Sequence, residues 1–339
     1  MIVKAIGKLI NAQHLSIDET VQVFEQIMSG SATDAQIGAY LIAQRMCGEG
    51  IEEITGAATV MRAKATPIPT HRQELVDTCG TGGDSSGTFN ISTASAFVAA
   101  GAGVPIAKHG NRSISSKCGS ADVLNSLGLN LELNSNQVGQ CIDDIGIGFL
   151  FAPMLHGAMK FAIGPRKEIG QRSIFNVLGP LTNPAGAKRQ VMGVFDSGLT
   201  ETLAEVLANL GADHVWVVHG LDGIDEISLC AVTKVSEYSH GMHNNFELDP
   251  RDYGFEFCQP KDLAGNTPDE NAGIIRKIFE GELSPRRDIV ILNAAAAILT
   301  SGLASSFEEG LEAATKSIDE GQALKKLKDL ITKTNSFGN

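Results

Sequence analysis

A glycine-rich turn between a strand-like and a helix-like segment constrains this chain more than any other feature. The turn Asp77-Thr-Cys-Gly-Thr-Gly-Gly-Asp84 follows the apolar pair Leu75-Val76 and precedes Ser92–Ala100, a run of small and apolar residues. Glycine lets main-chain N–H groups approach phosphate oxygens closely, and a helix N-terminus adds unpaired donors and a favourable dipole. A glycine cluster by itself is also compatible with a plain tight connection. In this setting it predicts a backbone-lined anion site.

The net charge of the chain limits what that anion can be. The 339 residues carry a formal charge of −12, with 43% hydrophobic and 19% charged residues, which is typical of a globular protein with a sizeable core. Non-specific nucleic-acid binding needs a basic surface, so we expect no nucleic-acid partner. Because an acidic chain repels an anion, we expect local cations or a metal ion at the site.

The cysteines and the N-terminus indicate the compartment. The six cysteines lie far apart and include no Cys-x-x-Cys pair, which argues against a zinc site or a disulfide framework and fits a reducing compartment. The first residues lack the apolar core of a signal peptide, and no run of about 18 apolar residues occurs. We therefore expect a cytoplasmic protein without a membrane partner.

The N-terminal part of the chain reads as helices only. Ser16-Ile-Asp-Glu19 and Thr33-Asp-Ala-Gln36 are capping-box patterns, and each is followed by apolar residues at helical spacing. A further helix is predicted from about Ile51 to Ala65, and it ends at Thr66-Pro-Ile-Pro69. The pattern predicts a small helical domain over residues 1–70, to which a later helical segment can add.

From residue 71 to 339 the pattern changes to strands that alternate with helices. The predicted strands are Leu75-Val76, Val104–Ala107, Gly148–Phe151, Val191–Phe195 and His214–Val218. The predicted helices between them include Ser120–Leu127, Gln137–Ile145 and Thr200–Leu210, and the tail adds Asn271–Glu280, Ile289–Ser301 and Phe307–Leu330. This alternation predicts an α/β domain with a mostly parallel central sheet and C-terminal helices, whose ligands bind at the carboxyl ends of the strands.

Polar segments follow several of these predicted strands. Lys108-His-Gly-Asn-Arg112 and the serines after it suit a polyanion, because cations offset its charge while hydroxyl and amide groups bind its oxygens. An exposed polar loop is the alternative.

In Asn90-Ile-Ser-Thr93, Ser92 or Thr93 is interpreted as a helix N-cap that also holds phosphate or metal. Asp225-Glu226, in a glycine-rich turn after a strand, offer the oxygen ligands that Mg²⁺ prefers, although a surface acidic turn has the same composition.

A second group of residues suits a carboxylated aromatic ligand. His156 and Arg166 are interpreted as lying on one long helical segment, ten residues apart and on similar faces. The fork of Arg166 matches the two oxygens of a carboxylate. The turn-rich stretch Phe175-Asn-Val-Leu-Gly-Pro-Leu-Thr-Asn-Pro184 can wall a flat pocket.

Taken together, these motifs resemble those of the anthranilate phosphoribosyltransferase family. The resemblance is carried, in order along essentially the whole chain, by Gly80-Thr-Gly-Gly-Asp84, Asn90-Ile-Ser-Thr93, Lys108-His-Gly-Asn-Arg112, Ser115-Ser-Lys-Cys-Gly-Ser-Ala-Asp122, Gly179-Pro-Leu-Thr-Asn-Pro184 and Asp225-Glu226. It implies a fold of the nucleoside phosphorylase and phosphoribosyltransferase type. Cys118 stands where this family often has serine, and Gly157 where proline is common.

The resemblance also implies an activity. In this family the amine of anthranilate attacks C1 of 5-phosphoribosyl 1-diphosphate (PRPP), giving N-(5-phosphoribosyl)anthranilate and diphosphate, a step of tryptophan biosynthesis. It implies Mg²⁺, two ions per monomer, and a homodimer formed through the small helical domain. The active site is then expected in a cleft at the hinge between the two domains.

Residue by residue, the resemblance implies three sets of ligands. The PRPP set is Gly80, Gly83, Asp84, Thr88, Asn90, Ile91, Ser92, Thr93, Lys108, His109, Gly110, Asn111, Arg112, Ser113, Ile114, Ser115, Ser116 and Ser120. The anthranilate set is Gly80, His109, Asn111, His156, Arg166, Gly179 and Pro180. The magnesium set is Ser92, Asp225 and Glu226, with Glu226 serving both ions. No residue is assigned as a general acid or base.

Two other classes fit part of the pattern. A pyrimidine nucleoside phosphorylase has a similar fold and phosphate loop, but it needs no paired metal carboxylates, so Asp225, Glu226 and Arg166 argue against it. A non-enzymatic member of the fold that binds nucleic acid is expected to be basic, and this chain is not.

Overall fold

The N-terminal helices form as their local signals predict. The computed structural model describes residues 1–113 and 117–338. Ser16 and Thr33 each accept a hydrogen bond from the backbone N–H of the third residue of the following helix. The side-chain oxygens of Glu19 and Gln36 accept the backbone N–H groups of Ser16 and Thr33 in turn. Gly48 ends the third helix with a φ of +90°. The four helices are α1 (Ile2–Leu9), α2 (Ile17–Met28), α3 (Asp34–Cys47) and α4 (Ile51–Lys64).

A seven-stranded sheet forms the centre of the rest of the chain, in the order β3-β2-β1-β4-β5-β6-β7. The strands are β1 (Val76–Asp77), β2 (Ile106–Gly110), β3 (Ile147–Phe151), β4 (Arg189–Gly193), β5 (His214–Gly220), β6 (Thr233–Ser239) and β7 (Met242–Leu248). The first five in spatial order pair in parallel, which confirms the predicted mostly parallel sheet. The antiparallel hairpin of β6 and β7 was not predicted, because β7 is an edge strand with largely exposed side chains and no clear alternation.

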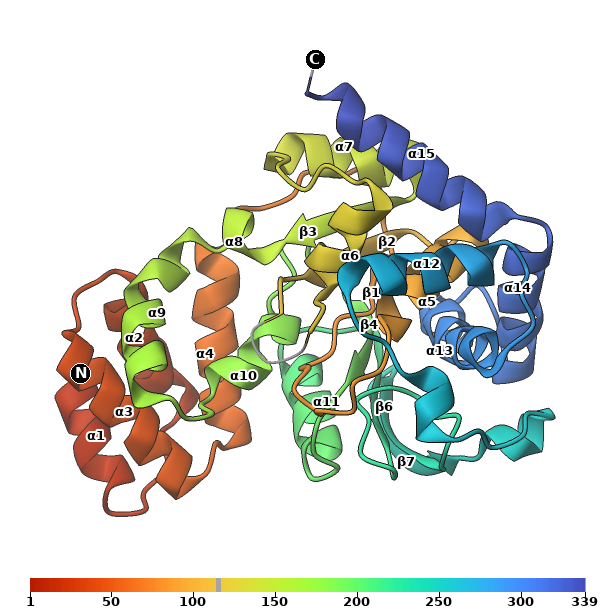
Figure 1. Cartoon of the computed structure of the whole chain (residues 1–339). Coiled ribbons are helices and arrows are strands. Elements are labelled where there is room, and N and C mark those ends of the chain that lie inside the picture. Colours follow the sequence, from red (N-terminus) through yellow and green to blue (C-terminus); the bar gives the residue numbers. More distant parts are fainter. Residues whose placement is uncertain (114–116, 339) are drawn as a thin grey trace.

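Helices cover both faces of this sheet (Figure 1). The helices that follow β1 are α5 (Ile91–Gly101), α6 (Ser120–Leu127), α7 (Ser135–Ile145), α8 (Ala152–Leu155), α9 (Lys160–Ile169), α10 (Phe175–Leu178), α11 (Leu199–Asn209), α12 (Pro268–Phe279), α13 (Pro285–Ser301), α14 (Phe307–Asp319) and α15 (Gln322–Ser336). Of these, α9 and α10 pack against the N-terminal helices and not on the sheet. Short 3-10 turns cover Gly157–Met159, Gly179–Leu181, Pro250–Tyr253 and Pro260–Leu263. The predicted tail helix Phe307–Leu330 is wrong as a single element, because Gly321, with a φ of +70°, separates α14 from α15.

Two hydrophobic clusters form the core. One packs α5 and α13 against the sheet, with Phe97 and Phe279 among its largest members. The other begins inside the N-terminal helices and continues through Phe175 of α10 to Val217, on β5. In Figure 1, α9 accordingly lies beside α2 and α3, from which it is far apart in sequence. Arg62 reinforces this junction by donating to the carbonyls of Leu181 and Leu210 at 2.7 and 2.9 Å.

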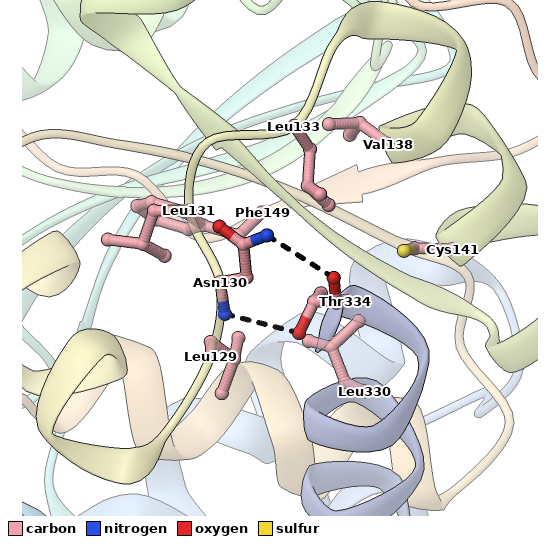
Figure 2. Close-up of a pocket in the computed structure, with 9 residues that line it drawn as sticks. All are labelled: Leu129, Asn130, Leu131, Leu133, Val138, Cys141, Phe149, Leu330 and Thr334. Carbon is pink, nitrogen blue, oxygen red and sulfur yellow. Dashed lines mark hydrogen bonds between the residues drawn. The ribbon is translucent and has the colours of Figure 1, made fainter. Parts of the chain in front are cut away.

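The C-terminal helix α15 docks over a small cavity (Figure 2). The backbone N–H of Asn130 donates to Thr334 Oγ1 at 3.3 Å, and its side-chain amide donates to the Thr334 carbonyl. The cavity measures about 10 Å³, enough for roughly one water molecule. Its walls are Leu129, Asn130, Leu131, Leu133, Val138, Cys141, Phe149, Leu330 and Thr334, so it is a packing defect and not a substrate pocket. Within the described residues, no helix is long and apolar enough to cross a membrane.

Candidate active site

The glycine turn lies at the carboxyl end of β1, where the end of β4 packs against it. Gly82 and Gly83 have φ values of +64° and +82°, which L side chains rarely adopt. Thr81 donates its N–H to the carbonyl of Gly193, the last residue of β4, at 2.8 Å. A Cβ on Gly80 would lie 2.7 Å from that same oxygen. The glycines are therefore required by backbone geometry, both for the turn and for its close approach to β4.

A cluster of carboxylates lies beside this turn. Asp225 donates its N–H to Asp84 Oδ2 at 3.4 Å, and Glu226 Oε1 accepts the N–H of Ser92 at 3.1 Å. Burial, followed by repulsion from the neighbouring carboxylates, raises the pKa of both Asp225 and Glu226. Lys108 opposes that rise at Glu226. Crowded, half-buried carboxylates with one nearby ammonium group offer hard oxygen ligands and a local excess of negative charge, so they fit a divalent cation such as Mg²⁺.

Lys108 is buried, which argues against the alternative that its segment is an exposed polar loop. Lys108, His109 and Gly110 are the last residues of β2, so the segment is a strand end and not a loop. The Lys108 ammonium donates to the carbonyl and the Oγ1 of Thr78, both at 3.1 Å, and to Ser92 Oγ at 3.4 Å. Lys108 therefore links β1, β2 and the start of α5 next to the carboxylates.

The start of α5 differs from the predicted cap. Asn90 is the N-cap residue and makes no side-chain cap bond, because its amide instead bonds to Cys118 and Asn271. Ser92 and Thr93 are already helical, so the N-cap assigned to them is wrong. Thr93 and Ile91 are buried, so the structure does not expose either of these predicted PRPP ligands.

A pair of histidines forms the opposite side of the site. His109 Nδ1 lies 3.2 Å from the Gly179 carbonyl, and His109 Nε2 lies 3.1 Å from His156 Nε2. Burial lowers the pKa of His109 to about 3 and that of His156 to about 4, so both rings are neutral near pH 7. Because the carbonyl can only accept, Nδ1 of His109 carries its proton and His156 donates to Nε2 of His109.

The conformation of His156 shows that the single helix predicted from His156 to Arg166 is wrong. The segment from His156 to Arg166 is not one helix, because His156 lies outside helical geometry between α8 and the following 3-10 turn. The three-turn spacing argument therefore fails. Arg166 is on α9, and its guanidinium carbon lies 4.8 Å from the centre of the Phe175 ring. Pro180, in the turn after α10, directs its carbonyl to Gln190 at 2.9 Å and is held rigidly.

The segment after β2 is tied to α6. Arg112 pairs with Asp122 at 3.0 Å, and Asp122 also accepts the N–H groups of Ser113 and Gly119. Ser120 Oγ donates to the Asn111 carbonyl at 3.2 Å. Thr88 forms an isolated bridge with Ala264. The predicted ligands Ile114, Ser115 and Ser116 lie outside the described residues.

Several residues at this site were not predicted from the sequence. Asp77, at the end of β1, is buried and accepts from the His109 N–H at 3.0 Å and from the Asn183 amide at 2.7 Å. Ligand atoms of Asp77, Cys79 and His109 lie within 4.8 Å of one another. Since hydrogen bonds already occupy Asp77 and both ring nitrogens of His109, we assign this group a structural role. Asn183 belongs to the Gly179–Pro184 motif that was identified from the sequence. Its hydrogen bond to Asp77 was not predictable from that motif.

Family models match the chain in two parts. Residues 3–65 match the helical bundle domain of a glycosyl transferase family, and residues 72–324 match its a/b domain. A protein of Acetivibrio thermocellus named anthranilate phosphoribosyltransferase is 55% identical over 337 residues, which cover 99% of this chain and 98% of the relative. The chain belongs to the anthranilate phosphoribosyltransferase family.

Solved structures of anthranilate phosphoribosyltransferases share the fold. The enzyme of Thermus thermophilus aligns with a TM-score of 0.92 at 39% identity, over 98% of this chain and 99% of its own. The Saccharomyces cerevisiae enzyme, in complex with PRPP and Mg, aligns with a TM-score of 0.90 at 28% identity, over 99% and 98%. The same yeast enzyme has also been solved in complex with 4-fluoroanthranilate.

Proposed function

We propose that this protein transfers the 5-phosphoribosyl group of PRPP to the amine of anthranilate, releasing diphosphate, in tryptophan biosynthesis. The observation that carries this proposal is the meeting of the glycine turn, Lys108 and the carboxylates Asp225 and Glu226 at the carboxyl ends of the strands. The family relatives bear the name of this activity across almost the full chain.

Each part of the site has a role in that reaction. Breaking the C1–O bond leaves positive charge on the ribosyl carbon and negative charge on diphosphate, so catalysis needs charge stabilisation and orientation. The glycine turn supplies N–H donors for phosphate. Asp84, Asp225, Glu226 and Ser92 would hold Mg²⁺, with two ions per monomer, and bound magnesium would offset the charge of the leaving group.

The histidine side of the site suits the aromatic substrate. Neutral His109 and His156 present flat, uncharged faces, and the Gly179-Pro180 turn closes the wall behind them. Arg166 supplies the cation for the anthranilate carboxylate. With a pKa near 3 or 4, neither histidine is poised as a strong base, and an aromatic amine loses its extra proton readily after attack. We therefore assign no general base.

An assay of the purified protein tests the proposal. Anthranilate fluorescence should fall in the presence of protein, PRPP and Mg²⁺ together, and it should stay constant when any one is omitted. Phosphorolysis of a pyrimidine nucleoside without loss of anthranilate would instead indicate the phosphorylase class. Binding to DNA or RNA without turnover would indicate a nucleic-acid-binding protein.

We further propose a two-domain homodimer. The boundary is placed at residues 70 and 71, with α9 and α10 completing the helical domain, since Ala162 and Phe175 share its hydrophobic cluster. We place the dimer surface on α1, the residue after it and α3, where Val3, Ile10 and Met46 have exposed fractions of 64%, 70% and 85%. Exposed apolar side chains of this size on a helical face suit a second copy of the chain.

Introducing a charge on this surface should separate the subunits. The variant Met46→Glu is expected to be monomeric, because burying an unpaired carboxylate in an apolar interface is costly. Light scattering on the eluted protein should then report a mass near 35.7 kDa in place of twice that value. Met242→Glu, on the exposed edge strand β7, is the matched control and should leave the mass of the wild type unchanged. A monomeric wild type would contradict the dimer.

Removing Arg166 should affect anthranilate selectively. A charge-assisted bidentate contact is worth roughly 1.5–3 kcal/mol, which corresponds to about 10- to 150-fold in affinity. Arg166→Ala should therefore raise the KM for anthranilate by about that factor and leave the KM for PRPP nearly unchanged. The neighbouring exposed Lys167, changed to Ala, is the control. Impairment towards PRPP alone, or no impairment, would refute the role of Arg166.

A further inference from the structure

Arg172 connects the segment between α9 and α10 to the glycine turn. Its Nη2 donates to the Gly83 carbonyl at 2.5 Å, and its guanidinium carbon lies 4.0 Å from the centre of the Phe195 ring. Phe195 follows β4 and donates its N–H to Thr81 Oγ1, within the same turn, at 3.2 Å. The guanidinium group is thus held between the turn and the end of β4, where its flat face stacks on an aromatic ring.

This hydrogen bond orients one peptide group of the turn. Because a trans peptide has its C=O and N–H on opposite sides, holding the Gly83 carbonyl towards Arg172 directs the Asp84 N–H the other way. In the described part of the chain, the Asp84 N–H has no protein acceptor. Gly83, at a φ of +82°, allows the turn to adopt this shape, and a Cβ there would lie 3.2 Å from Arg172 Nη2. The Asp84 N–H is therefore available to donate a hydrogen bond to a ligand oxygen.

The charge of Arg172, and the segment of the chain that carries it, indicate the role of its contact with Gly83. Among the described residues, no carboxylate forms an ion pair with its guanidinium group. In a chain of net charge −12, such an uncompensated cation beside an anion site raises the local potential. The segment that carries Arg172 continues from α9, which packs against α2 and α3. The contact therefore ties the helical domain to the glycine turn.

We propose that Arg172 is a positioning residue, which holds the glycine turn in the shape that receives the diphosphate of PRPP. The inference rests on the proposed function for the identity of that ligand. Arg172 acts on the ligand through the Gly83–Asp84 peptide, so its loss weakens PRPP binding and leaves the anthranilate side of the site unaltered.

Kinetics and calorimetry test this role with Arg172→Ala and Arg172→Lys. Arg172→Ala should raise the KM and Kd for PRPP about tenfold, as expected for the loss of one charge-assisted hydrogen bond, with the KM for anthranilate unchanged. Lysine keeps the charge and one donor but not the planar stack, so Arg172→Lys should recover part of the affinity. Arg251→Ala removes another arginine that stacks on a phenylalanine, at 4.4 Å, and should match the wild type.

Amide hydrogen exchange supplies a readout that does not depend on turnover. In Arg172→Ala, the amides of residues 80–87 should exchange faster than in the wild type, and those of α13 should not. An unchanged Kd for PRPP with unchanged exchange would overturn the proposal, as would a rise in the anthranilate KM alone. A wild type without transferase activity would refute the proposed function instead, while the exchange experiment would still decide whether Arg172 holds the turn.

Discussion

Changing Asp225 to Asn and Glu226 to Gln together is expected to lower turnover by on the order of 10³-fold, the scale on which a lost charge-stabilising group acts. Both carboxylates are half-buried near Asp84, and desolvation together with repulsion within the group raises their pKa values. The negative charge of these two side chains therefore opposes folding, and we expect it to serve ligand binding instead. The neutral amides should leave the melting temperature unchanged or higher, because they relieve that repulsion while keeping the shape.

Titration of turnover with magnesium, together with calorimetric binding of Mg²⁺, measures this effect. The matched control is the adjacent acidic pair Asp269 and Glu270, which is exposed in the first turn of α12. Changing that pair to Asn and Gln should preserve turnover and cost a little helix stability. Near-normal activity of the Asp225 and Glu226 variant at low magnesium would show that this cluster does not hold the metal.

Gly193→Ala is expected to damage both stability and binding. A Cβ at Gly193 would overlap the carbonyl oxygen and the carbonyl carbon of Asp225. Both are backbone atoms, so no side-chain rotation relieves the clash, and either β4 or the segment that carries Asp225 and Glu226 must move. We expect a loss of about 3 kcal/mol of folding free energy, at the upper end of overpacking costs.

Thermal unfolding and PRPP calorimetry on Gly193→Ala check this expectation. Gly273→Ala is the control, because a Cβ on that residue of α12 would meet nothing within 4 Å. Alanine there should stabilise the helix by up to about 1 kcal/mol. Wild-type stability and affinity in Gly193→Ala would mean that the crossing of the two segments is looser than the structure indicates.

Local signals in the sequence predicted much of the fold. Capping boxes at Ser16 and Thr33 start helices where expected, and the alternation of apolar runs with helical patterns predicts the parallel sheet. The errors lie where local pattern and tertiary context differ. The edge strand β7 is polar, a single glycine divides the tail helix at Gly321, and His156 interrupts a stretch with helical composition.

The site was predictable as a set of segments and not as a geometry. The residue types in the Gly80–Asp84 turn and at Asp225-Glu226 indicate phosphate and magnesium chemistry by themselves. That Lys108 is buried, that Arg172 reaches Gly83, and that Gly193 has no room for a methyl group depend on contacts between residues far apart in sequence. No periodicity or spacing encodes such contacts.

The shared core of the helical domain has a consequence for synthesis on the ribosome. Phe24 and Tyr40 emerge early, yet their cluster is completed only by Ala162, Phe175 and residues of β5. At ordinary translation rates the interval is on the order of ten seconds. During it the nascent helices α1–α4 carry an uncovered apolar face, which is a ready target for a chaperone or for another nascent chain. Slowing translation of the stretch between α4 and α9 would therefore change the yield of folded protein without altering any residue of the active site.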